Sequence, residues 1–229
     1  MTDFAALRED MVQRQIAGRG IADPCVLAAM RDVPRESFVP AASAPLAYDD
    51  SPLPIGFGQT SSQPYIVALM IAAARISPGD RVLEVGAGSG YAAAVIGRIA
   101  KQVFAIERHA ALAGQARQRM EKLGYANVAI LNGDGSAGLP GEAPFDAILA
   151  AASGPFVPPA LMDQLVIGGR LVMPIGASQA TQSLIRIVRC AEEEHEREVL
   201  GMVRFVPLIG KQGWDESGER PHGAWPAGR

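Results

Sequence analysis

The chain has 229 residues, of which 48% are hydrophobic, so it can form one α/β domain with a sizeable core and a modest extension. Its net charge of -3, from 21 basic and 24 acidic residues without a Lys/Arg run, does not favour a nucleic-acid partner. No apolar stretch has membrane-spanning length and no export signal is seen, which predicts a cytoplasmic protein without a membrane partner. Cys25 and Cys190 lie far apart without metal-ligand spacing, so neither a disulfide nor a metal site is predicted.

The first part of the chain predicts two helices followed by irregular structure. Apolar residues at positions 4, 7, 11 and 16 among charged ones indicate an amphipathic helix over Phe4 to Ile16. Asp23 and Pro24 are an N-cap and a first-turn proline for a second helix, Cys25 to Arg31. The stretch from Arg35 to Gly58 is rich in Pro and Gly and predicts irregular chain, which in a compact protein is usually functional or disordered.

A third helix is predicted after the sequence G-Q-T-S-S-Q-P. Pro64 followed by an apolar run marks its start, and Ser61 or Ser62 is the expected N-cap. A hydroxyl at the positive end of a helix has two roles that the sequence leaves open. It satisfies its own helix, or it donates to an anionic group of a ligand.

The central motif is a strand, a glycine-rich turn and a helix. Arg81 to Val85 is a short apolar run typical of a buried strand, and a helix is expected from Tyr91 to Ala100. The three alternate glycines between them, beginning with Gly86, admit positive φ and let a ligand approach the main chain. A dinucleotide fingerprint requires a third glycine where Tyr91 stands, and the spacing found is E-x-G-x-G-x-G, beginning at Glu84. A plain turn between strand and helix is the alternative.

The next two predicted strands end in polar groups that suit one nucleoside. The strand Gln102 to Ile106 ends at Glu107, whose carboxylate can accept hydrogen bonds from both hydroxyls of a ribose. The strand Val128 to Leu131 is followed by a turn whose glycines leave room for a flat ring. Asp134 in this turn can accept a hydrogen bond from an adenine amino group. The alternatives are a helix N-cap neighbour for Glu107 and a turn residue that bonds its own backbone for Asp134.

The remaining elements continue the alternation of strands and helices, which predicts a mainly parallel sheet. They are a helix Ala110 to Leu123, a strand Phe145 to Ala150, a short helix Pro158 to Leu165, a turn at Gly168-Gly169 into a strand Arg170 to Pro174, strands Gln182 to Arg189 and Glu198 to Val206 around a solvated loop Glu192 to Glu196, and a polar tail Asp215 to Arg229. The tail is expected to be frayed or disordered.

Several motifs resemble those of the protein-L-isoaspartate O-methyltransferases, in that family's order, over roughly Leu7 to Trp214. The motifs are F-V-P at 38–40, Y-D-D-S-P-L-P-I-G at 48–56, G-Q-T-S-S-Q-P at 58–64, V-L-E-V-G-A-G-S-G-Y at 82–91, G-D-G-S-A-G-L-P at 133–140, A-P-F-D-A-I at 143–148 and V-R-F-V-P-L at 203–208. The resemblance implies a Rossmann-like α/β methyltransferase fold with a mainly parallel twisted sheet, helices on both faces, an N-terminal helical cap and C-terminal antiparallel strands. It divides the chain into a cap with a substrate-side loop (1–60), a methyltransferase domain (61–214) and a flexible tail (215–229).

The resemblance also implies an activity and a set of site residues. The activity is methylation, with S-adenosylmethionine, of the α-carboxylate of L-isoaspartyl residues in damaged proteins, by a monomer that takes peptide in extended conformation. By position, Ser62 matches a serine beside the methyl group and the substrate carboxylate, and Asp50 falls in a segment on the substrate side. The matching cofactor contacts are Gly86, Gly88, Glu107, Asp134 and Gly135, with Glu84 next to the glycine turn and Gln212 as a further contact to cofactor or substrate.

Departures from the family pattern concern the substrate more than the cofactor. Leu139 stands where an aromatic residue is usual, Ile209 replaces a small polar residue, and the segment Ala151 to Phe156 lacks the usual threonine. Two alternatives therefore stay open. One is a methyltransferase of the same fold that acts on another carboxylate or small molecule, and the other is a cofactor-binding protein without transfer activity. Ser62 speaks against the latter, which would not need a serine beside the methyl group.

The implied chemistry agrees with the residue types. A carboxylate with an ordinary pKa near ~4 is already ionised at pH 7, so methyl transfer to it needs no general base. We accordingly expect no catalytic role for His109, His195 or His222. The rate must come from holding the carboxylate oxygen about 3–3.5 Å from the methyl group in line with the breaking bond. Ser62 is then a positioning group and not a nucleophile.

Overall fold

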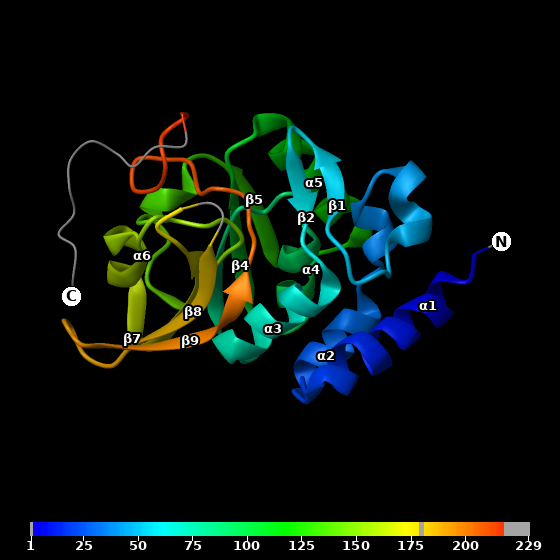
Figure 1. The fold of residues 1–229 in the computed structure, drawn as a ribbon, viewed down its shortest axis with the longest axis horizontal. Helices are drawn as coiled ribbons and strands as arrows, with labels where there is room; N and C mark the ends of the chain where they lie inside the picture. Colours follow the sequence, from blue (N-terminus) through cyan, green and yellow to red (C-terminus); the bar gives the residue numbers. More distant parts are fainter. Residues whose placement is uncertain (1, 179–180, 218–229) are drawn as a thin grey trace.

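The protein is built around one seven-stranded sheet, as a computed structural model that describes residues 2–178 and 181–217 shows (Figure 1). The spatial order is β5-β4-β3-β6-β7-β8-β9. The strands are β3 (Arg81–Val85), β4 (Gln102–Glu107), β5 (Val128–Asn132), β6 (Phe145–Ala150), β7 (Leu165–Ile175), β8 (Gln182–Arg189) and β9 (His195–Val203). Strands β3 to β7 are parallel, and β8 and β9 continue the sheet in antiparallel pairing. The predicted fold class is confirmed.

The topology of the sheet determines where a ligand can bind. From β3 the chain moves outward in one direction to β4 and β5, and then returns to the other side of β3 to form β6. In open sheets of parallel strands, ligands bind beyond the carboxyl ends of the strands at this change of direction. The glycine turn that follows β3 lies at this point, as do the polar residues that end β4 and β5.

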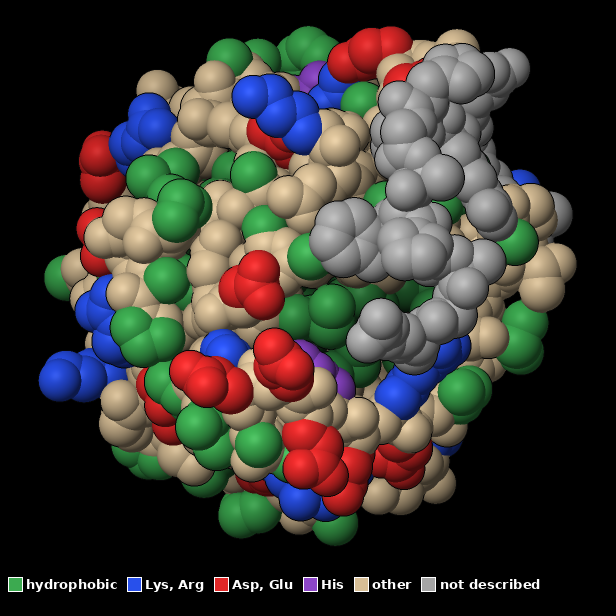
Figure 2. Space-filling view, turned by 90° about the vertical axis from the view of Figure 1, so that its left-hand side faces the viewer, with side chains coloured by type: hydrophobic (Ala, Val, Ile, Leu, Met, Phe, Trp, Pro, Cys, Tyr) green, Lys and Arg blue, Asp and Glu red, His purple; other side chains and the backbone are tan. Residues whose placement is uncertain are grey.

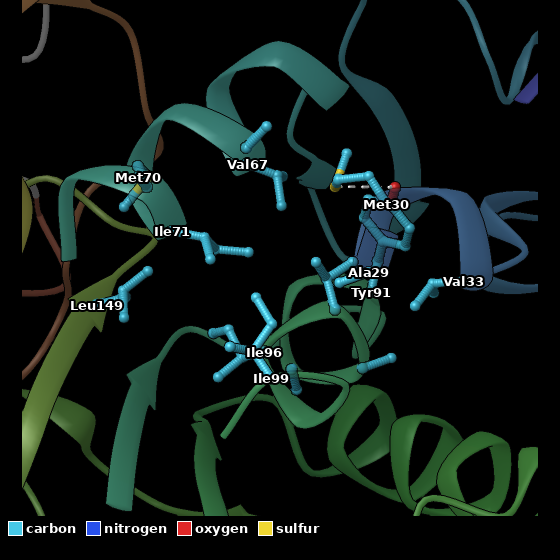
Figure 3. Close-up of a cluster of buried hydrophobic side chains, with 14 of the residues drawn as sticks. Ala29, Met30, Val33, Val67, Met70, Ile71, Tyr91, Ile96, Ile99 and Leu149 are labelled. Atoms are coloured by element: carbon cyan, nitrogen blue, oxygen red, sulfur yellow. Dashed lines mark hydrogen bonds between the residues drawn. The ribbon is translucent and has the colours of Figure 1, made fainter. Parts of the chain in front are cut away.

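The larger core lies between one face of the sheet and the helices α2 (Pro24–Asp32), α3 (Pro64–Ala74), α4 (Tyr91–Gly97) and α5 (Ala110–Leu123). Figure 3 shows part of it, which includes Met30 of α2, Val67 and Ile71 of α3 and Tyr91 of α4. The hydroxyl of Tyr91 lies 3.8 Å from the sulfur of Met30. The N-terminal helices therefore share their core with the sheet and do not form a separately packed body.

On the opposite face of the sheet, the smaller core is covered by one short helix and by loops. Its core cluster contains Leu161 of the short helix α6 (Pro159–Asp163), together with Leu208 from the C-terminal loop. Because both faces are covered, the parallel strands are nearly continuous apolar runs, as the buried pattern of β6 illustrates.

The N-terminal segment differs in detail from the prediction. Helix α1 (Phe4–Asp10) continues as a π-helix over Met11–Ile16, and its buried face begins only at Met11. Asp23 caps α2 by accepting hydrogen bonds from the N–H groups of Cys25 and Val26, as predicted.

The stretch 35–58, predicted as irregular, contains the first strand of a hairpin, which is a correction. It holds short 3₁₀ turns at Arg35–Phe38 and Ala41–Leu46, then strand β1 (Leu53–Gly56), which pairs with β2 (Gln59–Ser61). The turn between the two strands needs positive φ at Phe57 as well as at its glycine neighbours. A pattern of residue types does not predict that conformation for a phenylalanine.

Other boundaries also need correction. Helix α3 begins at Pro64 as expected, but its N-cap is Gln63 and no side-chain cap bond is made by Ser61 or Ser62. Helix α4 ends at Gly97 and not at Ala100. The predicted turn at 168–169 lies inside β7, and β9 runs over 195–203, so the loop before it is shorter than predicted.

The polar tail falls mostly outside the described residues, which end at Ser217. Within the described part, Glu216 pairs with Arg108 at 2.6 Å. Figure 2 shows one face of the molecule, on which acidic, basic and apolar side chains are interspersed. In the part of the chain that the structure describes, no helix is long and apolar enough to cross a bilayer.

Candidate active site

A cavity opens beyond the carboxyl ends of β3, β4 and β6, at the point where the strand order reverses. It measures about 980 Å³ including its mouth. Its walls combine three parts of the chain that the sequence analysis had singled out. They are the stretch 59–62 with part of α3, the residues 84–89, 91 and 92 of the glycine turn and its neighbours, and the residues Ile106, Glu107, Arg108, Gly135, Leu149, Ala151, Ala152 and 206–209 from the strand ends and later loops.

The glycine turn is held open by contacts that a side chain would disturb. The N–H groups of Gly86 and Ala87 both donate to the carbonyl oxygen of Ile106, at 2.8 and 3.0 Å. Gly88 has φ of +52°, and a Cβ there would lie 3.1 Å from the Cδ1 atom of Ile55 in strand β1. Glycine at position 88 thus lets strand β1 of the hairpin pack close against the turn that lines the cavity.

Glu107 connects the glycine turn to the start of helix α5. One carboxylate oxygen accepts a hydrogen bond from the Gly88 N–H at 2.8 Å, and the other accepts from the His109 N–H at 2.9 Å. The alternative role of Glu107, that of a residue next to a helix N-cap, is therefore found in the structure. Each carboxylate oxygen still has a lone pair to offer, and Glu107 lines the cavity, so the ribose-binding prediction is compatible with the same geometry.

Glu84 is a buried carboxyl in the wall of this cavity. Its side chain is 2% exposed, and its Oε2 atom has no hydrogen-bond partner among the described residues. Burial raises the pKa of Glu84 to about 8, and the negative charge of Glu107 adds to the effect. A group with a positive charge or with hydrogen-bond donors is the natural partner for such a carboxyl.

Asp134 and Gly135 are brought to the same end of the sheet, but only Gly135 lines the main cavity. Asp134 accepts hydrogen bonds from the Ser136 N–H and hydroxyl and from the Lys211 N–H, and it lines an adjoining hollow that includes Trp214. Burial acts to raise the pKa of Asp134, and these hydrogen bonds outweigh burial, so the pKa lies below its ordinary value. Asp134 is thus an ionised turn residue beside the cavity.

Ser62 lies where two cavities meet. The second cavity, about 1200 Å³ including its mouth, shares with the first a set of wall residues. The shared residues are Thr60, Ser62, Ala151, Val206 and Pro207. The carbonyl oxygen of Ser62 accepts a hydrogen bond from the buried guanidinium of Arg35 at 2.8 Å.

Asp50 does not line the walls of these two cavities. Its carboxylate accepts hydrogen bonds from the Tyr65 N–H at 3.1 Å and from the Gln63 side chain, and it pairs with Arg19 at 2.6 Å. It thereby satisfies the N-terminus of α3, the task that the sequence analysis gave to a serine. Gln212 is also outside both walls, where its side chain accepts from the Ala160 N–H at 3.2 Å.

Two features of the site were missed by the sequence analysis. Arg35 is fully buried and donates to the carbonyl oxygens of Ala47, Ser51 and Ser62, although a lone arginine in a loop usually predicts a surface position. The hairpin tip was missed as well. There the 56%-exposed Phe57 stacks on His109, with 5.7 Å between ring centroids.

These features together define the class of protein. A glycine turn after the first parallel strand, acidic residues at the ends of β3 and β4, and a buried carboxyl with one oxygen left without a hydrogen bond among the described residues suit a nucleoside joined to a positively charged group. S-adenosylmethionine, the cofactor implied by the resemblance, has this composition and fits the walls of the main cavity. The fold and the site are those of an S-adenosylmethionine-dependent methyltransferase.

Comparison with known proteins identifies the family. Residues 6–213 match the family model described as protein-L-isoaspartate(D-aspartate) O-methyltransferase. The chain is 57% identical over 226 residues, 99% of its length and 92% of the relative's, to protein-L-isoaspartate O-methyltransferase 1 of Rhodopseudomonas palustris. It is 57% identical over 207 residues, 90% of its length and 92% of the relative's, to protein-L-isoaspartate O-methyltransferase 2 of Pelobacter propionicus. The chain belongs to the protein-L-isoaspartate O-methyltransferase family, which confirms the resemblance.

Solved structures support the same conclusion. A protein-L-isoaspartate O-methyltransferase structure superimposes with a TM-score of 0.80 at 28% identity, covering 90% of this chain and 67% of the other. A Plasmodium falciparum protein described as a member of the family, in complex with S-adenosyl-L-homocysteine, gives a TM-score of 0.76 at 26% identity and covers 88% of this chain and 98% of its own. S-adenosylmethionine is accordingly the cofactor of this enzyme.

Proposed function

We propose that this enzyme transfers a methyl group from S-adenosylmethionine to the α-carboxylate of L-isoaspartyl residues in damaged proteins and peptides. The observation that carries the proposal is the position of Ser62 at the junction of two cavities. One cavity has the walls expected for the cofactor, and the other opens beside it. The alternatives, a different small acceptor or a protein without transfer activity, gain no support from the residues that line the site.

The cofactor-holding residues of the proposal are those around the main cavity. The cofactor supplies an activated methyl group on a positively charged sulfur. Gly86, Gly88 and Gly135 let the cofactor lie against the main chain. Glu107 accepts hydrogen bonds from the ribose hydroxyls, and Glu84 faces the positive charge on the sulfur. Asp134, beside the cavity, accepts a hydrogen bond from the adenine amino group with the lone pair that is left on its Oδ2 atom.

Ser62 acts on the acceptor carboxylate. Among the described residues that line the two cavities, none is a histidine, in keeping with an acceptor that is already ionised at neutral pH. The hydroxyl of Ser62 donates a hydrogen bond to one carboxylate oxygen and leaves the other directed at the methyl group. Holding the reacting atoms in this way can supply roughly 7–11 kcal/mol of the barrier reduction.

The edge strand of the sheet favours a substrate that binds in extended conformation. Strand β9 lies at the edge, with β8 as its neighbour, and the chain that follows it, 203–207, forms one wall of the second cavity. An edge strand presents main-chain N–H and C=O groups to which an extended peptide can pair. Residues 1–60 then act as the cap on the substrate side. Asp50 contributes to that side through its contacts with Gln63 and Tyr65, the neighbours of Ser62.

The location and assembly of the enzyme are part of the proposal. Cys25 and Cys190 are both free thiols, as is usual in a reducing compartment, which supports action in the cytoplasm. We propose a monomer that acts on protein, without nucleic-acid or membrane partners. Size-exclusion chromatography with light scattering, with and without S-adenosylmethionine, tests the monomer directly.

The decisive experiment is transfer of labelled methyl groups to two matched peptides, one with L-isoaspartate and one with L-aspartate at the same position. Base-labile label on the isoaspartyl peptide alone supports the proposal. Ser62→Ala is expected to lower kcat by roughly 10²-fold or more with little change in cofactor affinity, whereas Asp134→Ala mainly weakens the cofactor. Equal loss of cofactor binding in both variants, without a separate effect on turnover, would contradict the assigned roles.

A further inference from the structure

The second cavity has a single charged side chain among its described wall residues, Arg204. The other walls are polar but neutral, or apolar, as with Gln63 and Phe205. Arg204 is exposed, and it forms no hydrogen bond or ion pair with any described residue. By contrast, Arg186 on the neighbouring strand β8 is paired with Glu198 of β9. A cation without a partner at the wall of a substrate cavity is available to an anionic group of the substrate.

The place of Arg204 along the chain indicates which anionic group it meets. Val206 and Pro207 line both cavities, whereas Val203, Arg204 and Phe205 line only the second. Arg204 precedes Val206 by two residues, at most about 6.6 Å along an extended chain, and unlike Val206 it does not line the cofactor cavity. The proposed function places the reacting carboxylate beside Ser62, where the two cavities meet. Arg204 lines the second cavity alone, so it is placed to meet the residues of the substrate that flank the isoaspartyl residue.

We infer that Arg204 binds a second carboxylate of the substrate, one or two residues from the isoaspartyl residue, and makes the enzyme selective for acidic surroundings. The inference rests on the proposed function, because it assumes a peptide in the second cavity. A peptide residue spans about 3.3–3.6 Å when extended, so the separation of Arg204 from Val206 corresponds to at most about two residues. The carboxylate comes from an Asp or Glu side chain or from the C-terminus of a short peptide.

The expected size of the effect follows from the exposure of the site. Ion pairs at exposed positions contribute about 0.2–1 kcal/mol, which corresponds to at most about fivefold in an equilibrium constant. A guanidinium that engages both oxygens of a carboxylate falls at the upper end of that range. We therefore expect a two- to fivefold preference in kcat/KM, chiefly through KM, that weakens as salt is added.

The experiment uses blocked isoaspartyl peptides that differ only in one flanking residue, Glu, Gln or Lys, placed before or after the isoaspartyl residue. A further peptide carries Gln and a free C-terminal carboxylate two residues after the isoaspartyl residue, and so separates the two sources of the carboxylate. The enzymes are the wild type, Arg204→Gln and Arg204→Glu. Arg197→Gln is the matched control, because Arg197 is exposed on β9 but does not line the cavity.

The wild type and Arg197→Gln are expected to prefer a carboxylate peptide over its neutral counterpart by two- to fivefold. Arg204→Gln brings this ratio to about one, and Arg204→Glu favours the Lys peptide. If Arg204→Gln keeps the wild-type ratio, or if the wild type shows none, the inference is overturned although the proposed function stands. If no enzyme labels any isoaspartyl peptide while cofactor binding persists, the proposed function fails, and the inference fails with it.

Discussion

Replacing Glu84 with glutamine is expected to stabilise the protein increasingly as the pH rises from 5 to 8. The carboxyl is buried, and burial together with the charge of Glu107 raises its pKa from 4.5 to about 8. In this range the folded state keeps a proton that the unfolded state releases. The free energy of unfolding of the wild type therefore falls with rising pH, and glutamine, which does not titrate, removes that fall.

The magnitude follows from the two pKa values of Glu84. Between them the free energy of unfolding declines by about 1.4 kcal/mol for each pH unit, and the decline levels off above the folded value. From pH 5 to pH 7.5 the wild type is thus expected to lose about 3 kcal/mol relative to Glu84→Gln. The new amide makes contacts of its own, which change the absolute difference in free energy of unfolding between the two proteins. The test is therefore how that difference varies with pH.

The assay is urea unfolding of both proteins at half-unit steps from pH 5 to 8.5, analysed for the free energy of unfolding in water. Glu107→Gln is the second variant, since removal of the neighbouring charge lowers the pKa of Glu84 and moves the decline to lower pH. Saturating S-adenosylmethionine should flatten the wild-type curve, because a positive charge in the cavity favours the ionised carboxyl. A difference between the wild type and Glu84→Gln that stays constant with pH would refute the reasoning.

Two further substitutions test how the segment before Ser62 is held. Arg35→Ala should lower the free energy of unfolding by about 3 kcal/mol or more, because buried carbonyl oxygens lose a charged donor, and Arg35→Lys should recover only part of it. Denaturant unfolding measures both, and an unchanged midpoint in Arg35→Ala would contradict the assigned contacts. Asp50→Ala should cost about 1–2 kcal/mol through loss of the cap on α3, while Asp50→Asn retains an acceptor and loses less. Equal losses for the two Asp50 variants would show that the pair with Arg19 dominates instead.

The central sheet could be predicted because its signals are local. Arg81–Val85 and Phe145–Ala150 are short apolar runs bounded by turn residues, and the structure has strands with these bounds. The polar residues that follow parallel strands lie at the same edge of the sheet, so the chain order alone places Glu107 and Asp134 near the glycine turn. Here chain order and topology are sufficient to bring candidate residues together.

The predictions that were wrong concern features that depend on contacts between positions far apart in the sequence. Helix α3 is capped by Asp50, 15 residues before the N–H that it accepts, so the serines next to the helix were the wrong choice. Strand β1 has four residues with a proline among them, and its turn uses a left-handed Phe57. Helix α4 ends at Gly97, where the chain packs so close to β5 that a Cβ would lie 2.6 Å from the side chain of Val128, a contact that local propensity does not contain.

The same long-range contacts explain how the main chain around Ser62, to which we assign the substrate carboxylate, is held in place. Arg35 lies 27 residues before Ser62, and its Nη2 group donates to the carbonyl oxygens of Ser62 and Ser51, while its Nη1 group donates to that of Ala47. Asp50 fixes the following residues at the helix start. With the main chain held on both sides of Ser62, its hydroxyl needs to lose little further freedom when a carboxylate binds. Strand β2 ends at Ser61 and helix α3 begins at Pro64, so one buried arginine and one aspartate fix the short link between the two elements that carries Ser62.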